Sequence, residues 1–176
     1  MTESKNSEFE SIYMEHFSYV YNFIYMKVLD TQTAEDICST TFLKAYEKFE
    51  GYDPSLSGVR TWLCVIARNT IIDQVKSGYS KRTQLMDEMP DVAVNDEAQE
   101  KVIKKDLCDE VEKLLKILSE DERELISMRY GMGIQVKEIA SMLDTSPNSV
   151  SHRITRILEK CRKYEEKAGH ELADFI

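Results

Sequence analysis

The sequence is short of residues that interrupt helices and has no pattern typical of a metal or disulfide site. Only 6 Gly and 3 Pro occur among 176 residues, which favours helices over strands. Four cysteines lie far apart without a C-x-x-C pair, and the three histidines do not complete a zinc site. We therefore expect no metal, and a reducing compartment in which thiols are small buried apolar groups. The cysteines are Cys38, Cys64, Cys108 and Cys161.

Long apolar segments and catalytic motifs are also missing. No run of 18 apolar residues is present, which excludes a transmembrane helix, and the polar stretch MTESKNSEFES lacks the apolar core of a signal peptide. We expect a cytoplasmic protein with no membrane insertion. A Gly-rich phosphate loop, a nucleophile elbow and a carboxylate–histidine cluster are all absent, so we expect neither an enzyme nor a cofactor.

Positive charge is scarce overall but concentrated in two places. The chain carries a net charge of −9, yet residues 60–82 hold five Lys or Arg against one Asp. Residues 145–163 hold five Lys or Arg against one Glu. A charged stretch is often only a solvated helix face, but two basic islands in an acidic background indicate local contact with nucleic acid.

Apolar residues at helical spacing predict three helices in the first half, at about 8–29, 33–51 and 59–77. Thr33 followed by Asp36 predicts a capping box at the start of the second helix, with Glu35 and Asp36 near its positive end. Gly-containing residues 50–58, with Pro54, predict a loop. The expected core stripe of the first helix is Phe9, Ile12, Tyr13, Phe17, Val20, Tyr21, Ile24 and Val28.

A change of composition divides the chain. Residues 79–100 have no helical periodicity, contain Pro90 and are acidic, which is typical of a linker. A second helical unit begins near Ile103, and within it Ser119 is expected to cap a helix that has acids in its first turn and ends before Gly131. The sequence thus predicts an all-α fold of two small helical domains, residues 1–78 and 106–176, joined by a flexible linker at 79–105.

Residues 136–163 predict a helix-turn-helix. Asp144 is tolerated in a left-handed turn, Ser146 is a good N-cap and Pro147 a good first helical residue. In this motif the second helix enters the major groove of DNA. The residues expected to face DNA are Asn148, Ser149, Ser151, His152, Arg153, Arg156 and Lys160.

Individual side chains on that helix suit different contacts. Arg153 can form a bidentate contact with guanine, and Asn148 with adenine. Arg156, Lys160, Arg162 and Lys163 suit phosphates, which position the helix without reading sequence.

Three stretches together resemble a known family. AEDICSTTFLKAYEKF, RTWLCVIARNTIIDQVKS and LSEDERELISMRYGMGIQVKEIASMLDTSPNSVSHRITRILEKCRK are similar to bacterial RNA polymerase sigma factors of the extracytoplasmic-function (ECF) group. The likeness covers about residues 8–78 and 107–163. It implies a region-two domain that binds the polymerase clamp and melts the minus-ten element, and a region-four domain that binds the minus-thirty-five element and the polymerase flap. The implied partners are core RNA polymerase, promoter DNA and an anti-sigma factor.

The resemblance also assigns residues. The clamp-binding helix would be residues 34–49, with contacts from Glu35, Asp36, Thr40 and Lys44; Ser39-Thr40 replaces the usual Gln-Glu or Gln-Asp. In the helix-turn-helix, Asp144-Thr145 replaces the usual Gly and aliphatic residue. The loop at 50–59 lies where the family captures a flipped minus-ten base, a step that requires unstacking. The residues expected near the minus-ten element are Tyr52, Asp53, Ser55, Arg60, Arg68, Asn69 and Lys76.

The main alternative is a stand-alone, dimeric helix-turn-helix regulator in which residues 1–105 sense a signal or dimerise. Such a protein needs a symmetric interface and half-sites about 34–36 Å apart, and it gives the basic island at 60–82 no role. The acidic tail YEEKAGHELADFI is open to three interpretations: docking on the chain, binding a regulator, or fraying.

Overall fold

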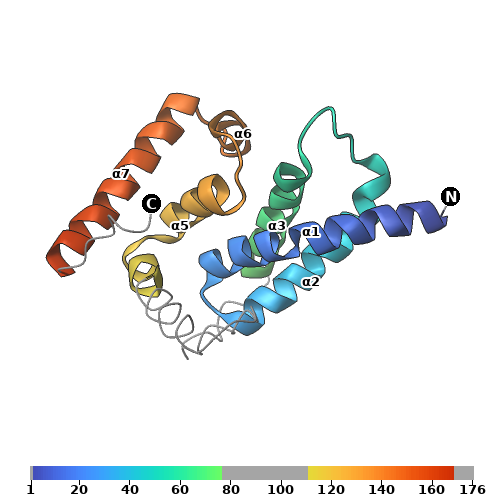
Figure 1. Ribbon diagram of the computed structural model, residues 1–176, viewed down its shortest axis with the longest axis horizontal. Helices are drawn as coiled ribbons and strands as arrows, with labels where there is room; N and C mark the ends of the chain where they lie inside the picture. Colours follow the sequence, from blue (N-terminus) through green and yellow to red (C-terminus); the bar gives the residue numbers. More distant parts are fainter. Residues whose placement is uncertain (1, 77–110, 169–176) are drawn as a thin grey trace, which may run out of the picture.

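The computed structural model describes residues 2–76 and 111–168, and every regular element in these ranges is helical (Figure 1). The prediction of an all-α protein with two helical domains is confirmed. Predictions for the linker, for Cys108 and for the end of the tail lie outside the described residues. The elements are α1 (Thr2–Val28), α2 (Thr31–Lys48), η1 (Phe49–Gly51), α3 (Val59–Lys76), a helix at 111–117, α5 (Glu120–Ile126), η3 (Ser127–Gly131), α6 (Val136–Met142) and α7 (Pro147–Ala168).

The N-terminal domain is a three-helix bundle. The connection between α1 and α2 is only two residues long, so the two helices run antiparallel, and α3 packs against both (Figure 1). Phe23 and Ile24 of α1 and Leu63 of α3 are almost completely buried between them. Cys38 and Cys64 are buried as free thiols, as expected, whereas Cys161 is half-buried.

The start of α2 differs from the prediction. Asp30, not Thr33, is the N-cap: its Oδ2 accepts a hydrogen bond of 2.8 Å from the Thr33 amide. Leu29 turns the chain with a φ of 54°, which brings Asp30 into the capping position. The N-cap therefore lies three residues earlier than expected, so Glu35 and Asp36 lie beyond the first turn of the helix and face solvent.

The predicted core stripe of α1 is only partly correct. Phe9, Val20 and Ile24 are buried, but Tyr13 and Phe17 lie at the surface. Tyr13 packs edge-on against Phe42 of α2, with ring centroids 4.8 Å apart. Aromatic rings at the edge of a helix pair can cover its core while staying partly exposed, which periodicity alone does not distinguish. The structure adds two buried residues that the prediction missed, Phe23 and His16.

The described part of the C-terminal domain runs from the helix at 111–117 to α7. Ser119 and Glu122 form a complete capping box at the start of α5, as the sequence predicts for the cap. The helix expected to reach Gly131 ends instead at Ile126, because the chain continues into the π-helical turn η3, closed by a bond from the Met132 amide to the Ser127 carbonyl. Gly133, with a φ of 69°, then turns the chain towards α6.

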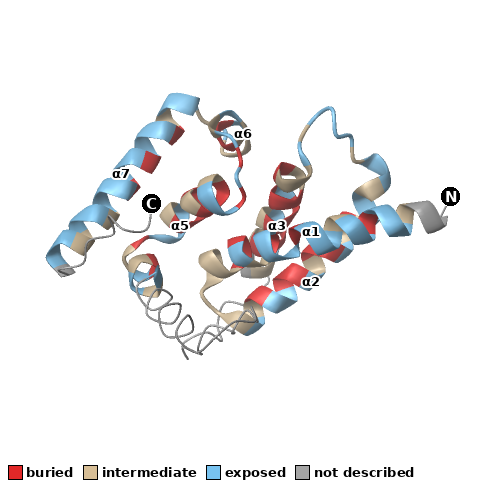
Figure 2. Ribbon diagram, viewed as in Figure 1, coloured by how far each residue is buried: buried red, intermediate tan, exposed pale blue. Residues whose placement is uncertain are grey.

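The two domains pack directly on each other and share one connected cluster of buried side chains (Figure 2). Leu125 and Met128 of the C-terminal domain belong to the same cluster as Phe23 and Leu63. α1 contacts both α5 and η3. Within residues 2–76 and 111–168, no helix combines the length and the apolar character needed to cross a membrane.

Candidate nucleic-acid interface

The helix-turn-helix is built as the sequence predicts. Asp144 occupies the left-handed region with a φ of 49°, and the Ser146 Oγ caps α7 by accepting a bond of 3.1 Å from the Ser149 amide. Val150 and Ile154 of α7 are buried, as are Ile139 and Ala140 of α6. The small side chain at Ala140 allows the two helices to approach closely.

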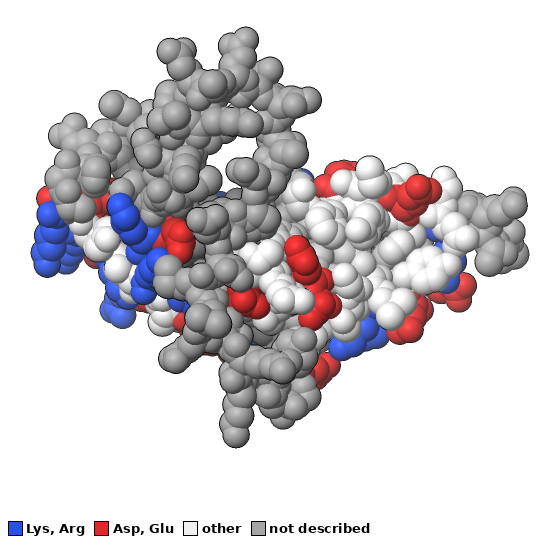
Figure 3. Space-filling view, turned by 90° about the horizontal axis from the view of Figure 1, so that it is seen from below, with Lys and Arg blue, Asp and Glu red and all other residues white. Residues whose placement is uncertain are grey.

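One face of α7 is buried and the opposite face is open to solvent. On the face that Figure 3 shows, several basic side chains lie together at the end of the molecule that carries α7. Such a surface on a helix-turn-helix suits the negatively charged groove of DNA. Of the predicted DNA-facing residues, Ser149 is half-buried and the others are exposed: Asn148, Ser151, His152, Arg153, Arg156 and Lys160.

Lys160 is exposed but already engaged. Its Nζ lies 2.7 Å from Oε2 of Glu122 on α5, and this ion pair links the two helices. Burial raises the pKa of Glu122, but hydrogen bonds from Lys160 and from the Ser119 amide outweigh it and leave that pKa below its ordinary value. Lys160 therefore also helps to orient α7 on the domain.

The loop between η1 and α3 is held by its own side chains. The Tyr52 hydroxyl donates a bond of 2.9 Å to the Ser57 carbonyl, and the Tyr52 ring packs 4.6 Å from that of Trp62. Asp53 Oδ1 accepts a bond of 2.8 Å from the Ser55 amide, and hydrogen bonding with Ser55 lowers the pKa of Asp53. Leu56, at the loop tip, is 83% exposed. The loop thus presents an aromatic wall beside a preformed turn.

The residues of α3 that are predicted to lie near the minus-ten element have different surroundings in the structure. Asn69 is exposed, while the guanidinium of Arg60 lies 3.8 Å from the ring centre of Tyr19. Arg68 contacts the C-terminal domain: its Nε is 2.7 Å from Oε1 of Glu124. The side chain of Lys76 lies outside the described residues. Arg60 and Arg68 are therefore both engaged within the closed molecule.

The predicted polymerase-binding residues lie along α2. Glu35 and Asp36 are exposed, and Lys44 forms an ion pair of 3.1 Å with Asp73 of α3. The Thr40 hydroxyl donates to the Asp36 carbonyl one turn back. Leu43, which the sequence interpretation left out, is exposed one turn beyond Thr40. A large apolar side chain on this otherwise polar face was the available signal for it.

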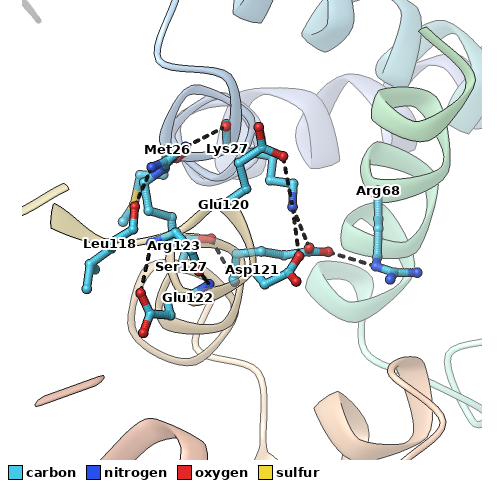
Figure 4. A network of polar contacts seen from close by, with 11 residues as sticks. Met26, Lys27, Arg68, Leu118, Glu120, Asp121, Glu122, Arg123 and Ser127 are labelled. Carbon is cyan, nitrogen blue, oxygen red and sulfur yellow. Dashed lines mark hydrogen bonds and ion pairs between the residues drawn. The ribbon is translucent and has the colours of Figure 1, made fainter. Parts of the chain in front are cut away.

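A polar network joins the two domains around α5 (Figure 4). The Glu124 carboxylate, whose side chain is 10% exposed, accepts hydrogen bonds from Lys27 Nζ at 2.9 Å and from Arg68 Nε at 2.7 Å. A separate hydrogen bond joins α3 to α6: the Thr61 hydroxyl donates to Glu138 Oε1 at 2.9 Å. Nothing in the sequence pattern indicated Lys27, because its partner is 97 residues away.

Arg123 adds further hydrogen bonds across the same interface. Its buried guanidinium donates to the carbonyls of Met26 and Leu118 at 2.7 Å each, and at longer distance to those of Lys27 and Leu115. One side chain thus satisfies carbonyl groups at the ends of two helices, where cations are favoured. Burial lowers the pKa of Arg123. In the described part of the chain, no group of His, Cys, Asp or Glu residues could hold a metal ion.

Two models of one protein family match this chain. Residues 12–80 match sigma-70 region 2, and residues 108–161 match sigma-70 region 4. Together the two matches span well over half of the sequence. They place the three-helix bundle in region two and the helix-turn-helix in region four.

Relatives of known name agree with this assignment. The ECF RNA polymerase sigma factor BldN of Streptomyces coelicolor is 27% identical over 86% of this chain, which spans only 59% of that protein's length. The ECF RNA polymerase sigma factor SigM of Bacillus subtilis is 26% identical over 78% of this chain and 82% of its own. The chain belongs to the sigma-70 family of RNA polymerase sigma factors, in the ECF group.

Solved structures show the same fold. The sigma factor RpoE of Bartonella quintana, determined with the anti-sigma factor NepR, aligns with a TM-score of 0.68 at 19% identity, covering 89% of this chain and 95% of its own. CnrH, determined with the cytosolic domain of CnrY, aligns with a TM-score of 0.63 at 19% identity, covering 92% of this chain and 90% of its own.

Proposed function

We propose that this protein binds core RNA polymerase in the cytoplasm and directs transcription initiation at promoters with minus-ten and minus-thirty-five elements. It performs no chemistry itself and needs no cofactor. The observation that carries the proposal is the pairing, in one chain, of a region-two bundle with a helix-turn-helix whose exposed face is basic. A stand-alone dimeric regulator has no use for a region-two domain, and we do not favour it.

In this proposal α7 reads the minus-thirty-five element. Its first turns carry Asn148, His152 and Arg153 on the exposed side, and hydrogen bonds from these side chains to base edges would give sequence preference. Arg156 and Lys160, further along the helix, would contact phosphates and set its position in the groove.

The loop between η1 and α3 would bind the minus-ten element. A flipped base would stack on the aromatic wall formed by Tyr52 and Trp62, which already lie together. Asp53 and Ser55 would read its edge, with the turn between them fixing their positions before the DNA arrives. Arg60, Arg68, Asn69 and Lys76 would contact the surrounding backbone.

The exposed face of α2 would bind the polymerase clamp. It offers Glu35, Asp36 and Thr40 as polar contacts, Lys44 as a cation and Leu43 as an apolar anchor. An apolar side chain surrounded by charged and polar groups is a common composition for a protein interface. We also propose that an anti-sigma factor binds this protein, since the structural relative RpoE was determined with such a partner.

Run-off transcription with core polymerase over a promoter library tests the proposal. We expect transcripts only when the protein is added, from promoters that share two elements at a constant spacing. Binding of the protein alone to a palindromic site, with no transcript from core polymerase, would instead support the dimeric regulator. Transcription from promoters that share no upstream element would contradict the role given to α7.

A further inference from the structure

Lys27 and Arg68 converge on a single acidic group. They come from different helices, the end of α1 and the middle of α3, yet their nitrogens lie 2.9 and 2.7 Å from the two oxygens of the Glu124 carboxylate. Both cations belong to the region-two domain, and Glu124 belongs to the region-four domain. The contact therefore exists only while the two domains are closed on each other.

Further acids of α5 surround the same cation. Asp121 and Glu120, in the first turn of α5, lie 3.6 and 4.0 Å from Lys27 Nζ and are themselves exposed (Figure 4). Lys27 thus faces three carboxylates from one helix. Their arrangement along the helix gives Lys27 a row of negative charges, which is also what a nucleic-acid backbone presents.

Separation of the domains would leave these two cations close together without the α5 carboxylates that pair with them among the described residues. The fold of the N-terminal bundle keeps Lys27 and Arg68 near each other, so they repel unless an anion lies between them. A phosphodiester offers two non-bridging oxygens to charge-assisted donors, much as the carboxylate does. Arg68 also lies beside Asn69 on the helix that carries the basic island at 60–82. The polyanion expected at this helix is therefore DNA.

We propose that Lys27 and Arg68 form a phosphate clamp for promoter DNA, and that Glu124 occupies this clamp in the closed molecule. Closure then competes directly with DNA binding, because one pair of cations cannot hold both anions. This inference rests on the proposed function, and it adds Lys27 as a DNA contact and Glu124 as an intramolecular competitor.

The decisive measurement is the affinity of the free protein for a fluorescent DNA duplex of mixed sequence, as a function of salt. Glu124→Gln removes the one carboxylate that both cations share and keeps the side-chain size. We expect it to tighten binding by about 5-fold or more, in the range usual for coupled sites. Asp73→Asn is the matched control: it changes the net charge equally and releases Lys44 from an ion pair outside the domain interface, so binding should change little.

A second variant identifies the clamp. Lys27→Gln should lower the slope of log affinity against log salt by about 1, as expected for the loss of one phosphate contact. When Lys27→Gln is combined with Glu124→Gln, the gain in DNA affinity caused by Glu124→Gln should disappear. When Lys27→Arg is combined with Glu124→Gln, that gain should remain. Circular dichroism confirms that each variant is folded before binding is compared.

Three results would overturn the clamp. They are equal affinities of wild type and Glu124→Gln, a gain that survives Lys27→Gln, and a gain in affinity for core polymerase without one for DNA. Run-off transcription by the wild-type protein separates this inference from the proposed function. If the wild type directs transcription but Glu124→Gln does not bind DNA more tightly, only the clamp is refuted. If Glu124→Gln binds DNA more tightly but the wild type directs no transcription, only the sigma-factor role is refuted.

Discussion

At the scale of single residues, Arg153 provides the sharpest test of the DNA-facing helix. Its guanidinium is exposed in the second turn of α7, where base edges would lie. We expect Arg153→Ala to lower transcription from a cognate promoter and to relax discrimination at one base pair, a loss of about 1–3 kcal/mol.

Lys167→Ala is the matched control for Arg153. It removes one positive charge from the far end of the same helix and should change promoter discrimination little. Equal discrimination by wild type and Arg153→Ala would contradict the assignment of Arg153 to a base.

His16 gives the protein a pH dependence. Burial lowers its pKa, Glu15 opposes this and Arg60 adds to it, so the net pKa in the folded protein lies below the ordinary 6.5. The unfolded chain therefore binds the proton more readily than the folded one. The contribution of neutral His16 to the free energy of unfolding is complete above about pH 6.5. It is lost as the pH falls through the pKa of His16 in the folded protein.

Chemical denaturation between about pH 7 and pH 5 tests His16. As the pH is lowered, the free energy of unfolding of the wild type should decrease, and the decrease should be smaller in His16→Gln. Parallel curves for the two proteins would show that His16 does not contribute.

At the scale of elements, the turn before α7 contains strain that the sequence could relieve. Asp144 has a φ of 49°, a conformation that costs most residues about 1–2 kcal/mol and glycine almost nothing. Asp144→Gly should therefore raise the free energy of unfolding by about 0.5–1 kcal/mol, measured by denaturant titration.

Ser141→Gly, three residues earlier inside α6, is the control for that turn. It introduces glycine where the backbone is helical and should lower stability by about 0.5 kcal/mol. Destabilisation by both substitutions would mean that the Asp144 side chain itself contributes to the turn.

Elements governed by local chemistry were predictable from the sequence. The Ser119 capping box, the Ser146 cap with Pro147 and the left-handed Asp144 each depend on residues within a few positions of one another. The N-cap of α2 was missed because Asp30 and Thr33 both suit the role, and only the turn at Leu29 decides between them.

Contacts between distant segments were not predictable. Helical periodicity shows that a residue lies on an apolar face, but not whether a second domain covers it. For this reason the sequence gave no indication of the contact between Arg68 and Glu124, which lie 56 residues apart. Neither Lys27 nor the carbonyl contacts of Arg123 left a signal in the spacing of residues.

At the scale of the whole molecule, the shared core predicts cooperative unfolding. Trp62, the single tryptophan, reports on the N-terminal domain, and far-UV circular dichroism reports on the helices of both domains. We expect the two signals to give coincident denaturant transitions in the wild type.

Arg123→Met should separate these two transitions. It leaves carbonyl groups at the domain interface without their donor, at a cost of about 1–3 kcal/mol. Coincident transitions in this variant, or separate ones in the wild type, would contradict the idea that the interface couples the domains.

If Lys27 and Arg68 form the proposed clamp, the Glu124 contact has a consequence for how such a protein can change over generations. A substitution at Lys27 or Arg68 would alter promoter contact and domain closure together, so neither property can be adjusted alone. A substitution at Glu124 changes only how often the molecule is open. Basal expression of the controlled genes can then rise or fall through this one position while the preferred promoter sequence stays the same.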